Sequence, residues 1–198
     1  YYQDNLDELV AAGAELRYFS PLNDRVLPEA DGLYLGGGYP ELHLSQLSQN
    51  ETMRESIRRA IENGMPTVAE CGGFLYLQSA LKDENGTLWP MVGALGGTGY
   101  GTDRLQRFGY LTLTGARDSL LLRAGEAVPA HEFHYWDCTD CGADMTAGKA
   151  NGRTWPCGFA GESLYAAFPH FHWGGEIPMA ARFVRAAEAY REAKRHEA

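Results

Sequence analysis

Two apolar segments in the first half of the chain each end in a glycine-rich turn that leads into a helical pattern. Residues 32–35 precede the three glycines at 36–38, and Pro40 then suits the first turn of a helix. Residues 65–70 precede Cys71 and two further glycines, with a helix expected to about residue 80. Between the two units, residues 51–63 show helical spacing. This alternation predicts a parallel sheet with helices on both faces.

Weaker patterns surround these two units. Apolar spacing predicts a helix over residues 6–14 and an amphipathic helix over about 178–194, and residues 15–20 alternate like a strand. Residues 142–153 are expected to form a loose surface loop. Short strands are expected over residues 106–112, 132–137 and 165–168. Together these patterns indicate an α/β fold with an open, mostly parallel sheet. A length of 198 residues suits one domain spanning 1–198.

The charge of the chain limits its partners. Asp and Glu number 26 against 17 Lys and Arg, a formal net charge of -9 that repels nucleic-acid phosphates and anionic membrane surfaces. No segment approaches the roughly 20 apolar residues of a membrane helix, so we expect a cytoplasmic protein that acts on small molecules. The four cysteines are then expected to be reduced. The chain begins with Tyr1 instead of Met, which indicates a piece of a longer polypeptide.

Cys71 stands where a strand is expected to turn into a helix, with small residues around it. This pattern is typical of a nucleophile elbow, in which a tight turn exposes the reactive side chain. The helix N-terminus is expected to favour the thiolate, and the N–H of Gly72 is expected to point at a developing oxyanion. The alternative is a buried structural cysteine in an ordinary turn.

The glycine turn at residues 36–38 is expected to meet Cys71, because ligands in such sheets bind at the carboxyl ends of the strands. The N–H groups of Gly37 and Gly38 could supply the second oxyanion donor, since a glycine peptide is easily turned toward a ligand. A phosphate loop is excluded because the ending Gly-Lys-Ser/Thr is missing. A simple tight turn is the alternative.

A cysteine nucleophile needs a base, and His170 and His172 are the best placed of the six histidines. They follow a strand-like run late in the chain, and residues i and i+2 of an extended segment face one side, so both could line one pocket. Such a pair could instead bind a metal ion, but no companion ligand has a recognisable spacing. His131 and His134 are expected on opposite faces of a strand and receive no catalytic role.

Five motifs together resemble one family. They occupy residues 33–42, 69–73, 104–110, 131–135 and 170–173, and their order is that of the glutamine amidotransferase domains of the cobyrinate and cobyrate synthase type. The resemblance implies a flavodoxin-like fold and a cysteine that forms a glutamyl thioester and releases ammonia. It also implies an ATP-dependent synthetase domain, with Mg²⁺, that uses the ammonia to amidate the a and c carboxylates of a corrin in cobalamin biosynthesis.

The resemblance also implies the partners. They are glutamine, the synthetase domain and a corrin at the interface between the domains, and a homodimer is compatible with this reading. The chain has no Gly-x-x-x-x-Gly-Lys-Ser/Thr motif. We therefore expect ATP and Mg²⁺ to bind to a synthetase domain that precedes Tyr1 together with the first strand of the sheet, and no cofactor to bind to the amidotransferase domain itself.

Matched to the family, Cys71 is the nucleophile and His170 the histidine that activates it, with His172 as runner-up. His172 occupies the place where many related amidotransferases carry a carboxylate, so a Cys-His dyad oriented by a backbone carbonyl is the simpler expectation. Arg104 is the candidate for binding the α-carboxylate of glutamine, and an ordinary solvated arginine is the alternative. No metal site is expected. Three further cysteines are interpreted as loop residues, with a zinc site as the alternative: Cys138, Cys141 and Cys157.

Two other functions stay open. The chain could be a different cysteine-dependent hydrolase on the same fold. It could also be a catalytically inactive domain that binds or regulates a synthetase.

Overall fold

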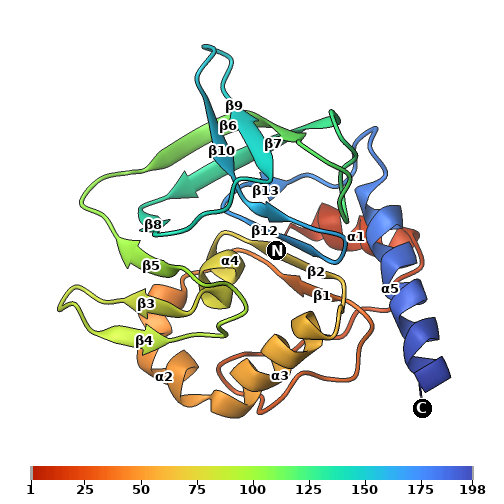
Figure 1. The fold of residues 1–198 in the computed structure, drawn as a ribbon, viewed down its shortest axis with the longest axis horizontal. Helices are drawn as coiled ribbons and strands as arrows, with labels where there is room; N and C mark the ends of the chain where they lie inside the picture. Colours follow the sequence, from red (N-terminus) through yellow and green to blue (C-terminus); the bar gives the residue numbers. More distant parts are fainter. Residues whose placement is uncertain (1, 198) are drawn as a thin grey trace.

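A mostly parallel sheet lies at the centre of the computed structural model, which describes residues 2–197 (Figure 1). Its order is β1 (Leu33–Leu35), β2 (Thr67–Glu70), β12 (Leu164–Ala167) and β11 (Phe159–Ala160). The first three strands are parallel and β11 is antiparallel to β12. Tyr1 and Ala198, the two ends of the expected domain, lie outside the described residues. The predicted open, mostly parallel sheet is confirmed.

Helices cover both faces of this sheet, as predicted. On one face, α3 (Glu51–Glu62) and α4 (Gly72–Leu77) share a core with Leu33 and Ala69. On the other face, α1 (Gln3–Ala11) and α5 (Met179–Glu197) share a core with Val68. A 3-10 turn, η1 (Pro40–His43), and the short α2 (Leu44–Gln49) follow the first glycine turn. None of the helices in the described part of the chain has both the length and the apolar character needed to cross a membrane.

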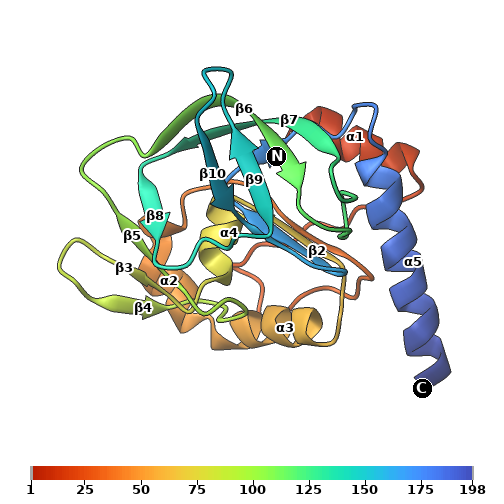
Figure 2. The same cartoon turned by 45° about the horizontal axis from the view of Figure 1, so that its top comes forward.

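A second sheet is antiparallel and shares the Val68 face with α1 and α5. Its order is β10 (Thr154–Cys157), β9 (Met145–Gly148), β6 (Arg107–Gly115), β7 (Ala127–His134) and β13 (His170–Phe171). The β9–β10 hairpin rises above the rest of the molecule (Figure 2). The loose loop predicted over residues 142–153 is therefore wrong, because Met145 and Ala147 belong to β9 and their side chains are buried in the core.

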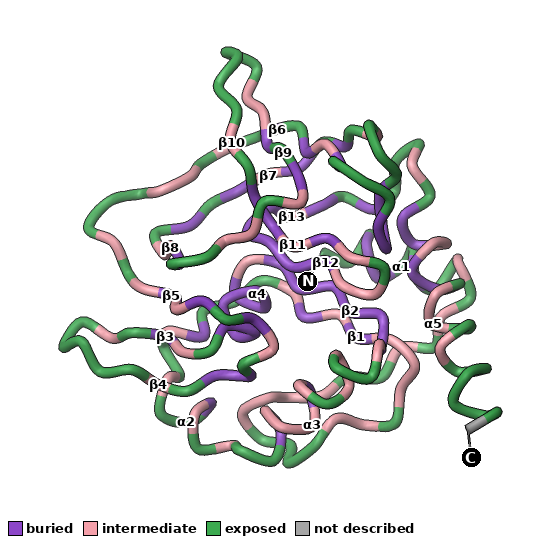
Figure 3. The backbone as a smooth tube through the Cα atoms, viewed as in Figure 1, coloured by how far each residue is buried: buried purple, intermediate pink, exposed green. Residues whose placement is uncertain are grey.

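A third sheet flanks α4, with the order β4 (Leu88–Pro90), β3 (Ala80–Lys82), β5 (Thr98–Gly101) and β8 (Trp136–Cys138). The strand predicted over 132–137 is divided here, since β7 ends at His134 in one sheet and β8 begins at Trp136 in another. No strand forms over residues 15–20. Figure 3 shows that burial is concentrated in β2, β12 and α4, between the layers. The end of β2 therefore lies in the most buried part of the molecule.

Candidate active site

Cys71 occupies the sharp turn between β2 and α4. Its φ of 50° is the one positive φ at a non-glycine position among residues 2–197, and backbone strain of this kind collects at functional sites. The N–H of Cys71 donates to the carbonyl of Ala167 at 2.9 Å, and its carbonyl accepts the N–H of Leu75 at 2.9 Å. The largely buried thiol is thus fixed at the carboxyl end of the central strand. The geometry agrees with the predicted nucleophile elbow.

The glycine turn after β1 packs directly on the turn after β2. A Cβ at Gly72 would lie 2.4 Å from the carbonyl oxygen of Gly38, and a Cβ at Gly73 would lie 2.3 Å from the carbonyl oxygen of Leu35. The N–H of Gly73 also donates to the carbonyl of Gly36 at 3.1 Å. Backbones can approach this closely only where side chains are absent. The prediction that two strand ends converge here is confirmed.

His170 reaches the same glycine turn from β13. It pairs across the strands with His131, and the two imidazole rings stack with centroids 5.0 Å apart. Its Cε1 lies 2.6 Å from the point where a Cβ of Gly37 would stand, so the ring fills the space that this glycine leaves. The Tyr2 hydroxyl hydrogen-bonds to Nε2 of His131 at 2.8 Å and braces the stacked pair. His170 and the two glycines that directly follow Cys71 therefore pack against the same glycine turn.

His172 makes different contacts. β13 ends one residue before it, so the alternation that would place it beside His170 is not continued. Its side chain is 61% exposed, and its Nε2 lies 3.7 Å from the carboxylate of Asp4 on α1. The structure thus brings His170, and not His172, against Gly37. Within residues 2–197, the imidazole ring of His170 makes no hydrogen bond to a backbone carbonyl, so the expectation that a carbonyl orients it is wrong. The ring is held instead by packing against His131 and Gly37.

Glu70 is a buried carboxyl that received no role from the sequence. Its Oε1 accepts the N–H of Phe171 at 3.0 Å, and its Oε2 accepts the hydroxyl of Tyr34 at 2.7 Å. It therefore links β2, which leads to Cys71, with β13, which carries His170. Burial raises the pKa of Glu70 to about 7. The signal in the sequence was an acidic residue at the end of an otherwise uncharged buried strand.

The environment keeps both members of the pair neutral. Burial raises the pKa of Cys71 to about 12, although the N–H of Gly72 lowers it. Burial, followed by the neighbouring His131, lowers the pKa of His170 to about 4. The expected thiolate at the helix N-terminus is therefore wrong for the resting site, because desolvation outweighs the stabilising amide. Three carboxyl groups raise the pKa of Cys71 further: Glu41, Glu70 and Glu132.

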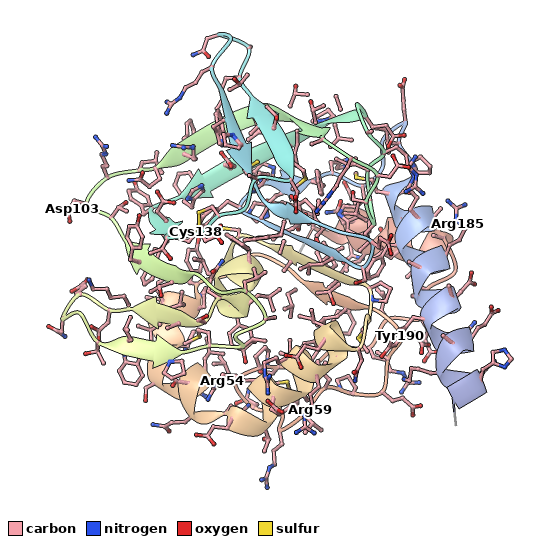
Figure 4. The ribbon with its side chains drawn as sticks, viewed as in Figure 1. Arg54, Arg59, Asp103, Cys138, Arg185 and Tyr190 are labelled. Atoms are coloured by element: carbon pink, nitrogen blue, oxygen red, sulfur yellow. A yellow bond between two sulfur atoms is a disulfide. The ribbon has the colours of Figure 1, made fainter. Side chains whose placement is uncertain are left out.

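Arg104 lies in the exposed connection between β5 and β6. Figure 4 places its neighbour Asp103 at the outer edge of the molecule. The carbonyl of Arg104 accepts the hydroxyl of Thr102 at 2.7 Å, and its guanidinium has no hydrogen bond or ion pair with any residue that the structure describes. The structure does not bring this side chain to Cys71.

The remaining cysteines lie apart from Cys71. Cys138 and Cys141 form a disulfide with their Cα atoms 5.7 Å apart, and Cys138 is labelled beside β8 in Figure 4. The expectation of reduced thiols is wrong for this pair, because a separation of three residues across the turn after β8 brings the two sulfurs together. With Asp137 they form the one cluster of metal-ligand type found among residues 2–197, but sulfurs joined in a disulfide offer no thiolate to a metal ion. Cys157 is a buried free thiol and does not belong to this cluster.

Comparison with known proteins gives one consistent result. Residues 1–176 match the model of the CobB/CobQ-like glutamine amidotransferase domain. Cobyrinate a,c-diamide synthase from Listeria innocua is 40% identical over 178 residues, which cover 87% of this chain and 39% of that protein. The synthase of the same name from Salmonella typhimurium is 38% identical over 192 residues, which cover 94% and 42%. The chain thus spans about two fifths of the length of the curated relatives it matches.

A solved structure shares the fold. It is a protein from Thermoplasma acidophilum described as a GMP synthase subunit, with a TM-score of 0.60 and 16% sequence identity, and the match covers 97% of this chain and 90% of that one. At this identity the likeness concerns the arrangement of the elements alone. It agrees with the flavodoxin-like architecture inferred from the sequence.

Proposed function

Because the chain belongs to the family of CobB/CobQ-like glutamine amidotransferase domains, we propose that it hydrolyses glutamine and passes the ammonia to a synthetase. The synthetase would use ATP and Mg²⁺ to amidate the a and c carboxylates of cobyrinate, in line with the names of the relatives. The main support from the structure is that His170 and the two glycines that directly follow Cys71 pack against the same glycine turn.

The first half of the reaction forms a thioester. Sγ of Cys71 attacks the side-chain amide carbon of glutamine while its proton moves to a ring nitrogen of His170. The amide oxygen becomes an oxyanion, which the N–H of Gly72 and one from Gly37 or Gly38 stabilise. His170 then gives the proton to the amide nitrogen, the C–N bond breaks and ammonia leaves. The cysteine keeps a γ-glutamyl group.

The second half restores the enzyme. Water attacks the thioester carbon and gives one proton to His170, and the same N–H groups stabilise the second oxyanion. The C–S bond breaks, the thiolate takes the proton back from His170, and glutamate leaves. The sum is glutamine plus water giving glutamate plus ammonia. The stacking of His170 on His131 supports this cycle because it holds the ring in one orientation for both proton transfers.

Arg104 is our proposal for the group that binds the α-carboxylate of glutamine. Its guanidinium is unpaired within the described residues, and the role requires the β5–β6 connection to fold over the site. Arg104→Ala should raise the KM for glutamine about tenfold or more and leave kcat within about threefold, because the carboxylate is bound equally in ground and transition states. Equal losses in kcat and kcat/KM would assign Arg104 to another task.

The remaining assignments follow the family. We propose that the chain is one amidotransferase domain of a larger cytoplasmic enzyme and binds no metal ion or cofactor of its own. ATP, Mg²⁺ and the corrin would then be bound by the synthetase part or at the interface. Self-association into a homodimer can be measured by sedimentation of the purified chain.

Covalent labelling tests the proposed function. A glutamine-analogue electrophile such as diazo-oxo-norleucine should add to Cys71, and glutamine should protect the thiol. The matched control is Cys157→Ala, which removes the other free thiol and should leave both the adduct and glutamate release intact. A protein with no adduct at Cys71 and no glutamate release would favour an inactive binding domain. Turnover of peptides in place of glutamine would favour a different cysteine hydrolase.

A further inference from the structure

Large aromatic side chains are exposed together on the outer surface of β6 and β7. Phe108 and Tyr110 on β6 are 67% and 87% exposed, and Phe133 and Tyr135, on β7 and just beyond its end, are 53% and 50% exposed. These two strands form the upper layer of the molecule in Figures 1 and 2. We refer to these four residues as the aromatic face.

The strand register makes this face continuous. Phe108 pairs across the strands with Phe133, and the two rings meet edge to face with centroids 5.8 Å apart. Phe133 contacts Tyr135 in the same way at 5.9 Å. Alternate residues of a strand share a side, so Tyr110 projects beside Phe108. The inward residues of the same strands, such as Leu111, are buried, so this surface is the outer side of a packed sheet.

The aromatic face adjoins the candidate active site. Tyr110 pairs across the strands with His131, whose ring stacks on that of His170. On the other side of His170, the glycine turn leads directly to Tyr39 and then to Leu42, which are 69% and 72% exposed. Exposed apolar groups therefore lie on both sides of His170.

Exposed apolar residues on the other described segments do not cluster in this way. Val10, Tyr18, Val26 and Leu88 are exposed singly on separate segments. Single exposed apolar residues are normal, whereas a contiguous aromatic surface marks a site of interaction, and aromatic residues dominate the binding energy of protein interfaces. A shallow hollow of about 370 Å³, partly lined by Tyr110, Thr112 and Lys149, adjoins the face and could receive a side chain of a partner.

We propose that the aromatic face is the docking surface for the ammonia-using synthetase. The proposal rests on the proposed function and names the partner's contact surface. Ammonia released beside His170 is useful only if it reaches the synthetase before it escapes into water, so the partner must cover the surface beside His170, where the aromatic face begins. The relatives are long enough to include such a partner as a further domain, since the match to this chain covers only 39–42% of their length.

Charge at the border of the face also fits a protein partner. The chain as a whole carries a net charge of -9, but Lys149 donates its Nζ hydrogen bond to the carbonyl of Phe108 at 2.7 Å, and Arg104 precedes β6 in the exposed connection. Cations beside an aromatic centre favour a partner with acidic residues around an apolar patch. A second copy of this chain, itself strongly acidic, would meet a repulsion between like net charges.

The test uses the chain together with its synthetase, in one polypeptide or as two subunits. The double variant Phe108→Ser with Phe133→Ser removes the cross-strand pair of the aromatic face and leaves Tyr110, which lies opposite His131, in place. Tyr18→Ser is the matched control, since Tyr18 is 72% exposed on a separate segment. Three rates are measured: glutamate release, amide formation from glutamine, and amide formation from ammonium chloride.

We expect the double variant to release glutamate within about twofold of the wild-type rate and to use ammonium chloride normally. The yield of amide per glutamate should fall at least fivefold, and Tyr18→Ser should match the wild type. An unchanged yield in the double variant would overturn the proposal. So would a chain that is dimeric on its own and becomes monomeric in the double variant, because a second copy would then occupy the face.

A binding measurement separates this proposal from the proposed function. Amide hydrogen exchange over residues 107–112 and 131–135 should slow when the synthetase is present, even with Cys71→Ala, which abolishes the chemistry. If the wild type releases no glutamate, the proposed function fails while exchange still decides the docking surface. Unchanged exchange over both strands, in a preparation that releases glutamate, would overturn the docking proposal alone.

Discussion

Replacing Gly37 by alanine tests the placement of His170 directly. The new Cβ would stand 2.6 Å from Cε1 of His170, whereas carbon atoms in contact lie about 3.5–4.0 Å apart. The imidazole must therefore retreat by about 1 Å. It cannot retreat freely, because the ring of His131 is stacked on it. The change acts on one proposed catalytic group and adds only a methyl group to the protein.

A displacement of about 1 Å can lower the rate of an enzyme about 100-fold, so we expect Gly37→Ala to lower kcat for glutamate release about 10- to 100-fold, or about 1.4–2.7 kcal/mol. The free energy of unfolding should change by less than about 1 kcal/mol. The cost of moving the His170 side chain is offset because alanine lowers the conformational entropy of the unfolded chain. The measurements are steady-state glutamate release, urea denaturation and the NMR signal of the His170 Cε1–H group.

Gly38→Ala is the matched control, because a Cβ at Gly38 has no neighbour within 4 Å. We expect it to leave the His170 signal in place and to cost less activity than Gly37→Ala. Equal kcat values for the two variants, or a His170 signal that does not move in Gly37→Ala, would refute the reasoning that His170 is held against this glycine.

Two predictions concern protonation. Burial raises the pKa of Glu132 to about 7, and its Oε2 has no hydrogen-bond partner among residues 2–197. Because the pKa is higher in the folded than in the unfolded state, this group costs no stability below pH ~4.5. The free energy of unfolding then falls by about 3 kcal/mol as the pH rises through 7. Glu132→Gln should lack this loss, which urea denaturation at pH 5 and pH 8 can measure. If the free energy of unfolding changed equally between these two pH values in both proteins, the carboxyl would not be desolvated. Because the pKa of Cys71 is about 12, its alkylation by iodoacetamide in the absence of glutamine should speed up about tenfold per pH unit from 7 to 10. A plateau near pH 8 would contradict this protonation state.

The local turns of the site could be predicted from the sequence, because each depends on neighbouring residues. An apolar run that ends in glycines defines the corner at Cys71 and the turn at Gly37 whatever the rest of the chain does. The fold class follows from the same two units. The antiparallel sheet was harder to predict, because short strands such as β9 and β13 acquire their partners from distant segments, and β13 has only two residues.

The electrostatics of the site could not be predicted for a similar reason. A thiol at a helix N-terminus should ionise easily if the local dipole decides. In the fold, however, α4 has only six residues and Cys71 is largely desolvated beside Glu70 and other carboxyl groups. The role of Glu70 depends on the N–H of Phe171, which lies 101 positions away in the chain. Burial and distant partners therefore reverse the prediction made from the turn.

A neutral resting pair has a consequence for control of the reaction. With the pKa of Cys71 near 12 and that of His170 near 4, an ion pair between them is strongly disfavoured in the free site. The proton must then pass from sulfur to imidazole as the carbon–sulfur bond forms, when the negative charge moves to an oxygen facing the N–H of Gly72. Bound glutamine and the proposed partner would both change the solvation and charge around these two groups. A resting site that is poorly nucleophilic is thus suited to an enzyme that should release ammonia only when an acceptor is in place.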